Sequence, residues 1–432
     1  MNNFQTILVA IFMAFFVFAV MIFSGLLSLP SLGGGKGGPT GKIVIWGTFN
    51  NNELYKVFED AGTPYKDLNI SYIKKNKATY EKDLIEAFAK DQGPDLFFTT
   101  PSLIEKYENF VYKIPYASYS AKTFKDSFID GADSFLAIDG VVGFPVVVDP
   151  LVMYFNKNIL SNKGIALPPT YWDQLFNLNP ELTKLDESGA VNTSMIALGR
   201  YDNVLNSKDI LATLLFQNGN PIIKRTDVGY TPVLKGDSFS LSSPAEAVFN
   251  FFVEFSNPGK TAYSWNRSLP VSTEMFTSGK MALYLGRASE LFTIRTVNPN
   301  LSFDVTEIPQ TRDSNIKRTF GEIYALSVNK SSTNLTSAVS LAGILSTSEN
   351  ASNLAKALSL PPVLKTLLAV KPEDPYLFTF FNSALISQGW LDPDMAGSDK
   401  VFSELVENLL SNKLEVAGAV SRAQDQLELL IK

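Results

Sequence analysis

The chain has 432 residues, of which 45% are hydrophobic and 19% are charged, and its formal net charge is −6. This composition is typical of globular proteins, and the length exceeds what one hydrophobic core usually supports, so we expect more than one compact unit. The acidic balance argues against a nucleic-acid partner, because phosphate binding needs clustered Lys and Arg.

The chain contains neither cysteine nor histidine. Disulfides, thiolate nucleophiles and Cys-ligated metal centres are therefore excluded. The usual general base at neutral pH, the Ser-His-Asp arrangement and the commonest metal ligand are missing as well. We expect no metal site, no cofactor and no catalytic activity. Carboxylate-based glycoside hydrolysis is the most plausible enzymatic alternative that this composition leaves open.

A long apolar segment without charges lies near the N-terminus. No charged side chain occurs from Met1 to Gly35, and residues 4–27 read FQTILVAIFMAFFVFAVMIFSGLL. A helix of about 24 residues at ~1.5 Å per residue spans roughly 36 Å, enough to cross a hydrocarbon core of ~30 Å. We predict a transmembrane anchor here, followed by a glycine-rich, flexible tether over residues 28–41.

Cleavage of this segment is the alternative to an anchor. A cleaved signal peptide usually has a shorter apolar run of ~7–15 residues after a basic start. A lipoprotein signal needs a cysteine, which is absent. We therefore expect a retained signal anchor. Lys36 and Lys42 follow it and weakly favour a cytoplasmic location for the chain beyond, but long domains translocate largely regardless of charge.

Strands and helices alternate in the first part of the globular region. The β-branched run KIVIW over residues 42–46 predicts a buried strand, and residues 53–61 an amphipathic helix. A strand over 69–73, a helix over 79–90 and a buried strand over 95–98 follow. This order indicates βαβ units and a parallel sheet covered on both sides.

The same alternation continues later in the chain. Ser243 combines a capping box with a following proline, and it predicts a helix that runs through residue 255. Residues 274–278 form a predicted helix that ends at Gly279, and residues 281–285 form the next strand. Helices dominate from Leu335 onward.

Six segments together resemble one protein family. In chain order they read KIVIWG (42–47), GPDLFF (93–98), IDGVVGFPVVVDPLVMYFNKNIL (138–160), PPTYWDQL (168–175), MFTSGKMALYLG (275–286) and FGEIYALSV (320–328). In order and spacing they resemble the maltose-binding type of extracellular solute-binding protein family 1, over about residues 42–432. Each segment alone is a weak signal, whereas six in the right order are a specific one.

The resemblance implies an α/β fold of the periplasmic-binding-protein type, class II, with two hinge-connected lobes and parallel-rich sheets behind the transmembrane helix. Residues 42–148 and about 323–370 would form lobe 1, and residues 149–322 and about 371–432 lobe 2. Strands over 141–148 and 151–155 would cross between the lobes. Thr170 would cap a helix, and Trp172, Met275 and Phe276 are expected in the core.

The resemblance also implies a function. Such proteins bind a small solute between the lobes, and closure creates the surface that an ABC permease recognises. We therefore expect a monomeric, extracytoplasmic receptor, held on the cytoplasmic membrane by a single-pass helix, whose solute is a carbohydrate or similar. The sequence does not distinguish this transport receptor from a sensory subunit that binds solute without transporting it.

Candidate ligand-binding residues follow strand ends or lie at the two crossovers between lobes. They are Thr48, Asn50, Asn51, Thr99, Thr100, Asp149, Tyr201, Asp202, Arg287, Phe320, Glu322 and Trp390. Asp149 matches the position of a sugar-binding carboxylate in the family, and its alternative role is a cap at the hinge. Tyr201 and Trp390 offer ring faces for a sugar, with core packing as the alternative.

The sequence departs from malto-oligosaccharide binders at two places. Asn50, Asn51 and Asn52 replace the acidic and basic residues after the first strand, and the aromatic pair before the penultimate helix falls near residues 398–400. The resemblance therefore implies the fold and leaves the solute open. Asp149 and Glu322 could also serve as the two carboxyls of a glycoside hydrolase if they lay ~5–9.5 Å apart.

Overall fold

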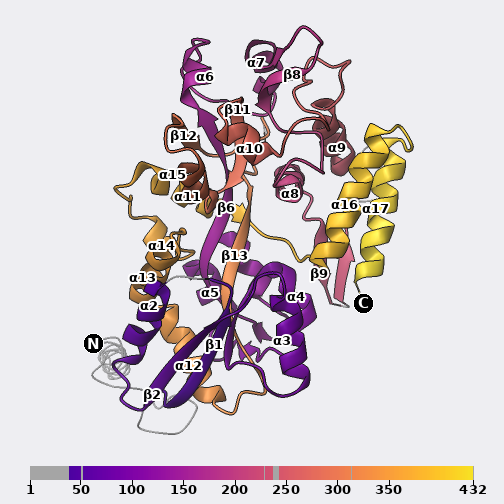
Figure 1. Cartoon of the computed structure of the whole chain (residues 1–432). Coiled ribbons are helices and arrows are strands. Elements are labelled where there is room, and N and C mark those ends of the chain that lie inside the picture. The colour runs from indigo at the N-terminus through magenta and orange to yellow at the C-terminus, as the bar shows by residue number, and fades with distance from the viewer. Residues whose placement is uncertain (1–37, 50–51, 228, 237–242, 313, 432) are drawn as a thin grey trace, which may run out of the picture.

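The computed structural model of the chain describes residues 38–49, 52–227, 229–236, 243–312 and 314–431 (Figure 1). They form two α/β lobes joined by one curled, mixed sheet with the strand order β2-β1-β3-β13-β6-β11-β8-β7. Two further strands of this sheet lie outside that order: β12 pairs with β6, and β14 pairs with β13. The buried core extends from Ile43 to Leu427.

The first lobe is built on parallel strands with helices packed beside them. β1 (Gly41–Gly47) lies between β2 (Leu68–Lys74) and β3 (Leu96–Thr99) in parallel register. The intervening helices are α2 (Asn52–Gly62), α3 (Tyr80–Ala89) and α4 (Pro101–Tyr107). The strand–helix alternation that the sequence predicted for this region is confirmed, with ends shifted by one or two residues.

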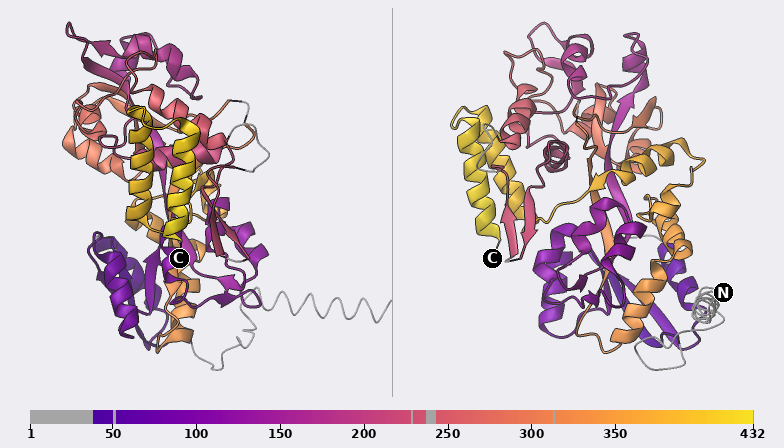
Figure 2. Two further views of the ribbon diagram at one scale, coloured as in Figure 1. Left: turned by 90° about the vertical axis from the view of Figure 1, so that its right-hand side faces the viewer. Right: turned by 180° about the vertical axis from the view of Figure 1, so that it is seen from behind.

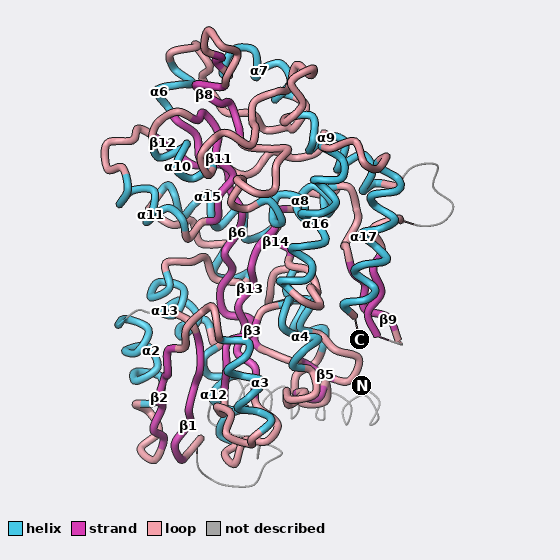
Figure 3. The backbone as a smooth tube through the Cα atoms, turned by 45° about the vertical axis from the view of Figure 1, so that its right-hand side comes forward, coloured by secondary structure: helices cyan, strands magenta, loops and turns pink. Residues whose placement is uncertain are grey.

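Two long strands connect the lobes. β6 (Phe144–Asn156) and β13 (Thr319–Val328) pair in antiparallel register and run through both halves of the molecule, as the backbone trace shows (Figure 3). The sequence predicted separate strands over 141–148 and 151–155, which is wrong. Pro150 lacks a backbone N–H but does not interrupt β6: it stays in register with Gly321 of β13, and its carbonyl accepts the Ala288 backbone N–H at 2.9 Å.

The second lobe continues the sheet beyond β6. The sheet strands of this lobe are β7 (Lys184–Leu185), β8 (Val191–Ile196), β11 (Met281–Arg287) and β12 (Phe303–Thr306). β11 is antiparallel to β6 and parallel to β8. The sheet is therefore mixed rather than parallel-rich, because β6 and β13 run antiparallel to their neighbours along the main strand order.

Helices flank the second lobe and the crossing strands. The helices near its sheet are α6 (Lys157–Ser161), α7 (Gln174–Leu182), α8 (Ser207–Gln217), α9 (Pro244–Glu254), α10 (Ser272–Thr277) and α11 (Glu290–Val297). The last two helices, α16 (Met395–Leu410) and α17 (Val416–Leu430), pair as a hairpin on one flank (Figure 2).

Between β13 and α16 the chain forms α12 (Leu335–Leu345), α13 (Ser348–Leu358), α14 (Lys365–Leu368), α15 (Pro375–Leu385) and β14 (Ser387–Gln388). The remaining elements are short: β4 (Ile114–Pro115), α5 (Ala121–Ser127), the 3-10 helix η1 (Asp130–Phe135), β5 (Gly140–Val141), β9 (Ile223–Thr226) and β10 (Gly229–Pro232). β9 and β10 form a separate hairpin.

The predicted core positions are confirmed, and one predicted cap is wrong. Met275 and Phe276 are buried, and Trp172 is buried with its indole N–H donating to the Gln217 side-chain oxygen at 2.7 Å. Thr170 does not cap a helix, because α7 begins only at Gln174. Instead, the Gln174 side-chain oxygen accepts the backbone N–H of Thr170 at 2.8 Å, which holds the preceding turn.

The predicted anchor over residues 4–27 and most of the tether over 28–41 lie outside the described residues. Within residues 38–431, as far as the structure describes them, no helix is both long and apolar enough to cross a membrane.

Candidate functional site

Polar and aromatic side chains gather on one face of the crossing strands. Asp149 of β6 lies directly opposite Glu322 of β13, so their side chains point to the same face. Residues two apart on a strand share a face, which adds Phe320 and Tyr324. Arg287 of β11 lies opposite the residue two positions after Asp149 on β6, so the Arg287 side chain points to the same face. We call these five residues the crossover face.

Asp149 is held by the loop that follows β11. It is 4% exposed, and its two carboxylate oxygens accept hydrogen bonds from the Ser289 backbone N–H at 2.9 Å and the Ser289 hydroxyl at 2.6 Å. Burial raises the pKa of Asp149, and the Arg287 cation and the Ser289 donors oppose that rise. Because both oxygens are engaged, Asp149 fixes the junction between β6 and this loop.

Arg287 is the cation of the crossover face. Its Nε donates to Asp209 Oδ2 at 2.7 Å, and its Nη1 lies 3.7 Å from Glu322 Oε2. Burial alone would lower its pKa, but the surrounding carboxylates outweigh burial and raise it. The guanidinium also lies 5.3 Å from the centre of the Phe320 ring. One cation therefore faces three carboxylates, those of Asp149, Asp209 and Glu322.

Glu322 is the least satisfied of these carboxylates. Its side chain is 16% exposed, and it accepts no hydrogen bond from any residue that the structure describes, apart from the loose ion pair with Arg287. Burial raises its pKa, and Arg287 opposes that rise. Two carboxylate oxygens with spare acceptor capacity can receive hydroxyl or ammonium donors from a solute.

Two aromatic rings lie beside this carboxylate. The Phe49 ring, just after β1, makes edge contacts with Tyr324 at 4.9 Å and Phe98 at 5.2 Å between ring centres. Phe49 and Tyr324 are half-buried. Burial, and then the carboxylate of Glu322, raise the pKa of Tyr324, so its hydroxyl stays protonated. Ring faces of this kind can pack against the apolar face of a sugar.

A second polar cluster joins the start of α8 to the start of α16. The Lys208 ammonium contacts Asp392 Oδ2 at 3.2 Å and donates to the Met395 carbonyl at 2.9 Å and to Ser398 Oγ at 3.2 Å. Asp392 is 2% exposed, and burial raises its pKa while Lys208 opposes the rise. The Lys208 ammonium therefore fixes the N-terminus of α16 against α8.

Several contacts cross from one lobe to the other. Lys106 of α4 forms ion pairs with Glu81 of its own lobe and with Asp394, 3.3 Å away, at the start of α16. The β9–β10 hairpin contributes Tyr230, whose hydroxyl donates to Glu108 Oε2 at 2.9 Å. Arg225 of the same hairpin donates to a backbone carbonyl of the first lobe. These contacts tie α4 and its neighbours to α16 and to the β9–β10 hairpin.

Glu105 of α4 lies close to this junction. It is half-buried, and its Oε2 is buried without a hydrogen-bond partner among the described residues. Burial raises its pKa to about 7, opposed by Lys106 and reinforced by the carboxylates of Asp392 and Glu108. This group therefore changes charge near neutral pH.

The predicted residues after β1 and β3 are only partly described. Asn50 and Asn51 lie outside the described residues, and Thr48 is half-buried. Thr99 and Thr100 are buried, and the Thr100 hydroxyl lies 2.8 Å from that of Ser102. They lie at the end of β3, as predicted, and their ligand contact stays a prediction.

The remaining predicted residues make contacts within the protein. The Tyr201 hydroxyl donates to Asp399 at 2.6 Å, and burial and then this carboxylate raise the Tyr201 pKa. Asp202 accepts two hydrogen bonds from Arg200, at 3.0 and 2.8 Å. Trp390 is 5% exposed with its ring edge-on to Phe402, and its contact with a ligand stays a prediction.

The sequence did not single out five residues of this region. They are Glu105, Lys208, Asp209, Tyr324 and Asp392. Tyr324 could have been found, because it lies two residues after Glu322 on a strand and must share its face. Glu105, Lys208 and Asp209 come from helices and Asp392 from the loop before α16, and their approach to this region depends on long-range packing. Among the described residues, no group of three or more acidic side chains is placed to hold a metal ion.

Comparison with known proteins identifies the class. Residues 53–379 match the family described as bacterial extracellular solute-binding protein, and the chain belongs to this family. A protein of Brucella abortus (strain 2308) whose name assigns it to the binding proteins is 26% identical over 211 residues, 45% of this chain and 44% of that relative. A Brucella suis biovar 1 (strain 1330) protein matches equally. The chain thus spans less than half the length of the curated relatives it matches.

Solved structures show the same fold. A cyclo/maltodextrin-binding protein complexed with maltotetraose aligns with a TM-score of 0.74 at 14% identity, over 91% of this chain and 98% of that chain. The GacH receptor of Streptomyces glaucescens GLA.O, solved unliganded and with acarbose, aligns with a TM-score of 0.67 at 16% identity over the same shares. The predicted two-lobe, maltose-binding-like fold is confirmed. The alignments cover 98% of each solved chain, so almost the whole fold is present here.

Proposed function

We propose that this chain is the solute receptor of an ABC importer, and that it binds a sugar or sugar-like polar solute on the crossover face between its lobes. The observation that carries the proposal is the direct pairing of Asp149 and Glu322 on the two strands that join the lobes. In support of the proposal, Glu322 and Tyr324 lie on one of the two strands that join the lobes, and Phe49 contacts Tyr324.

The chemistry of the crossover face suits vicinal hydroxyls. Glu322 has free acceptor capacity, Arg287 offers guanidinium donors, and Phe49 and Tyr324 supply ring surface beside them. A sugar presents hydroxyls that donate and accept along its edge and an apolar C–H face, so one solute can use all of these groups.

Transport requires the lobes to move. The contacts of Lys106 with Asp394 and of Tyr230 with Glu108 join the lobes directly. We infer that they break when solute enters and re-form around it, and that the closed form presents both lobes to an ABC permease. The receptor acts as a monomer, because one chain supplies both sides of the site.

Glycoside hydrolysis is not favoured by the geometry. An acid or nucleophile must have an oxygen free to reach the substrate. Both oxygens of Asp149 accept hydrogen bonds from Ser289, and the family and its structural neighbours are binding proteins. Release of reducing ends from a glycan would establish the hydrolase instead.

We also propose that residues 4–27 anchor the extracytoplasmic receptor in the cytoplasmic membrane and that residues 28–41 give it reach. The support is the long, uncharged apolar segment and the absence of a cysteine for lipid attachment. Carbonate extraction of membranes tests this proposal: an anchored receptor stays with the membrane fraction, whereas a cleaved one is released with a shortened N-terminus.

The proposed solute site is tested by a melting-curve panel of mono-, oligo- and amino sugars on a chain of residues 38–432. A solute present at ~100 times its Kd adds about 2.7 kcal/mol of stability. Glu322→Gln should shrink the shift, whereas the matched exposed variant Glu187→Gln should leave it unchanged. If no sugar, polyol or amino compound moves the melting curve, the receptor proposal loses its support.

A further inference from the structure

A hollow adjoins the loop after β11, where Ser289, which holds Asp149, is one of its lining residues. A pocket of about 790 Å³ is enclosed by α11, α13, α14 and α15 beside β6. Figure 1 shows these helices together on one side of the crossing strands, with α4, α8 and α16 on the other. The volume lies within the range of roughly 300–1,000 Å³ typical of small-molecule sites.

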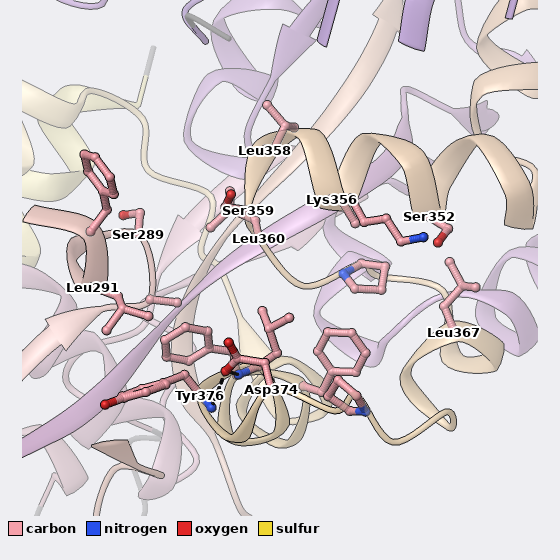
Figure 4. A pocket seen from close by; sticks show the side chains of 18 of the residues that line it. Ser289, Leu291, Ser352, Lys356, Leu358, Ser359, Leu360, Leu367, Asp374 and Tyr376 are labelled. Atoms are coloured by element: carbon pink, nitrogen blue, oxygen red, sulfur yellow. Dashed lines mark hydrogen bonds between the residues drawn. The ribbon is translucent and has the colours of Figure 1, made fainter. Parts of the chain in front are cut away.

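The lining is largely apolar and partly open to solvent. Leu360 and Phe380 are buried in its wall, whereas Phe292 is 78% exposed and Val370 is 65% exposed at its rim. Figure 4 shows Leu291, Tyr376 and further apolar side chains facing the hollow from α11 and α15. Contiguous apolar surface left exposed in this way marks a binding site rather than packing between helices.

The charged side chains around this pocket differ in whether they already have partners within the protein. Asp374 is committed to capping α15, since its Oδ1 accepts the backbone N–H groups of Tyr376 at 2.7 Å and Leu377 at 3.2 Å. Arg295 stacks over the Tyr376 ring at 4.4 Å. Lys356 of α13 makes no side-chain hydrogen bond or ion pair within the described part of the chain, and Figure 4 shows it next to Ser352.

We propose that this pocket binds a long-chain carboxylate, with the acyl chain among the apolar side chains and the carboxylate at Lys356 and Ser352. The lining contains two cations, Arg295 and Lys356, and one carboxylate, Asp374, which already caps α15. This excess of positive charge favours an anionic headgroup over a neutral or cationic one. The volume suits a single acyl chain, which gains affinity from every buried methylene. None of the five residues of the crossover face lines this pocket, although Ser289, which holds Asp149, does.

The test measures displacement of a fluorescent polyene fatty acid from residues 38–432 by saturated carboxylates of eight to eighteen carbons. Affinity should rise roughly fourfold per added methylene until the pocket is full. Lys356→Gln should weaken binding of the carboxylate roughly fivefold and leave binding of its methyl ester unchanged. Lys413→Gln, an exposed lysine on the α16–α17 hairpin, is the matched control.

Leu377→Trp, which fills the pocket, should abolish displacement while the melting curve shows a folded protein. The proposal is overturned if no carboxylate displaces the probe, if Lys356→Gln weakens acid and ester equally, or if Leu377→Trp binds normally. A sugar that binds on the crossover face should not displace the probe. Failure here therefore leaves the receptor proposal intact, and failure of the sugar panel leaves this one intact.

Discussion

Glu105 gives a pH-dependent prediction that can be worked out from the structure. Burial raises its pKa from 4.5 to about 7, so the folded protein holds this proton more tightly than the unfolded chain. The stability that this group contributes is fully present below about pH 4.5 and is lost as the pH rises through about 7. Above that pH, the folded protein carries a poorly satisfied charge.

Glu105→Gln removes this charge without changing the shape of the side chain. A pKa rise of about 2.5 corresponds to at most ~3.4 kcal/mol, and solvent screening of a half-exposed carboxyl reduces this to about 1–2 kcal/mol. The variant should therefore be more stable than the wild type by that amount at pH 8 and nearly equal to it at pH 4.5.

Urea unfolding at both pH values, followed by far-UV circular dichroism, measures the difference. Glu187→Gln, an exposed carboxylate in the turn before β8, serves as the matched control and should change stability at neither pH. A Glu105→Gln variant that is no more stable than the wild type at pH 8, or that gains equally at both pH values, would refute the reasoning.

Three further substitutions have defined outcomes. Gly199→Ala should destabilise the protein by roughly 1–3 kcal/mol in urea unfolding, because the backbone has φ +87° there and the added Cβ would lie 2.7 Å from the Ser256 backbone nitrogen. Tyr230→Phe removes the hydrogen bond to Glu108 between the lobes, so solute binding measured by calorimetry should weaken roughly fivefold. Arg287→Met removes the cation that opposes the burial-driven rise in the pKa of Asp149 and Glu322. Its cost should be about 3–5 kcal/mol at pH 8 and smaller at lower pH, because protonation of a carboxylate whose folded pKa is raised removes the unpaired charge. These expectations would be contradicted by an unchanged unfolding midpoint for Gly199→Ala or by unchanged solute affinity for Tyr230→Phe. A destabilisation by Arg287→Met that does not depend on pH would contradict them as well.

The fold could be predicted where local pattern and core packing agree. The buried runs that became β1 and β3 are continuous β-branched or apolar segments, and Trp172 and Phe276 are core residues wherever their elements lie. The long strand β6 was missed, because Pro150 is normally a strand breaker. Only the tertiary pairing with β13 and the loop after β11 shows that the strand continues.

The site was predicted less completely than the fold. The crossovers were located because Asp149 and Glu322 lie within recognisable segments, and the strand register places the two residues opposite each other. Asp209 and Lys208 were missed because their positions depend on how α8 packs over β13. Trp390 was offered as a ring platform or a packing residue, and a sequence does not contain the burial that distinguishes the two. The lobe boundaries remain a prediction.

Hydrogen–deuterium exchange with the sugar that gives the largest melting shift tests the central claim most directly. If a solute binds between the lobes, exchange should slow around Phe49, which contacts Tyr324, and in the loop after β3. It should also slow in residues 200–209, which include Asp209 beside Arg287, and in residues 389–395. It should stay unchanged in α13 to α15. Protection confined to those helices, or to the outer faces of the lobes, would contradict a solute site on the crossover face.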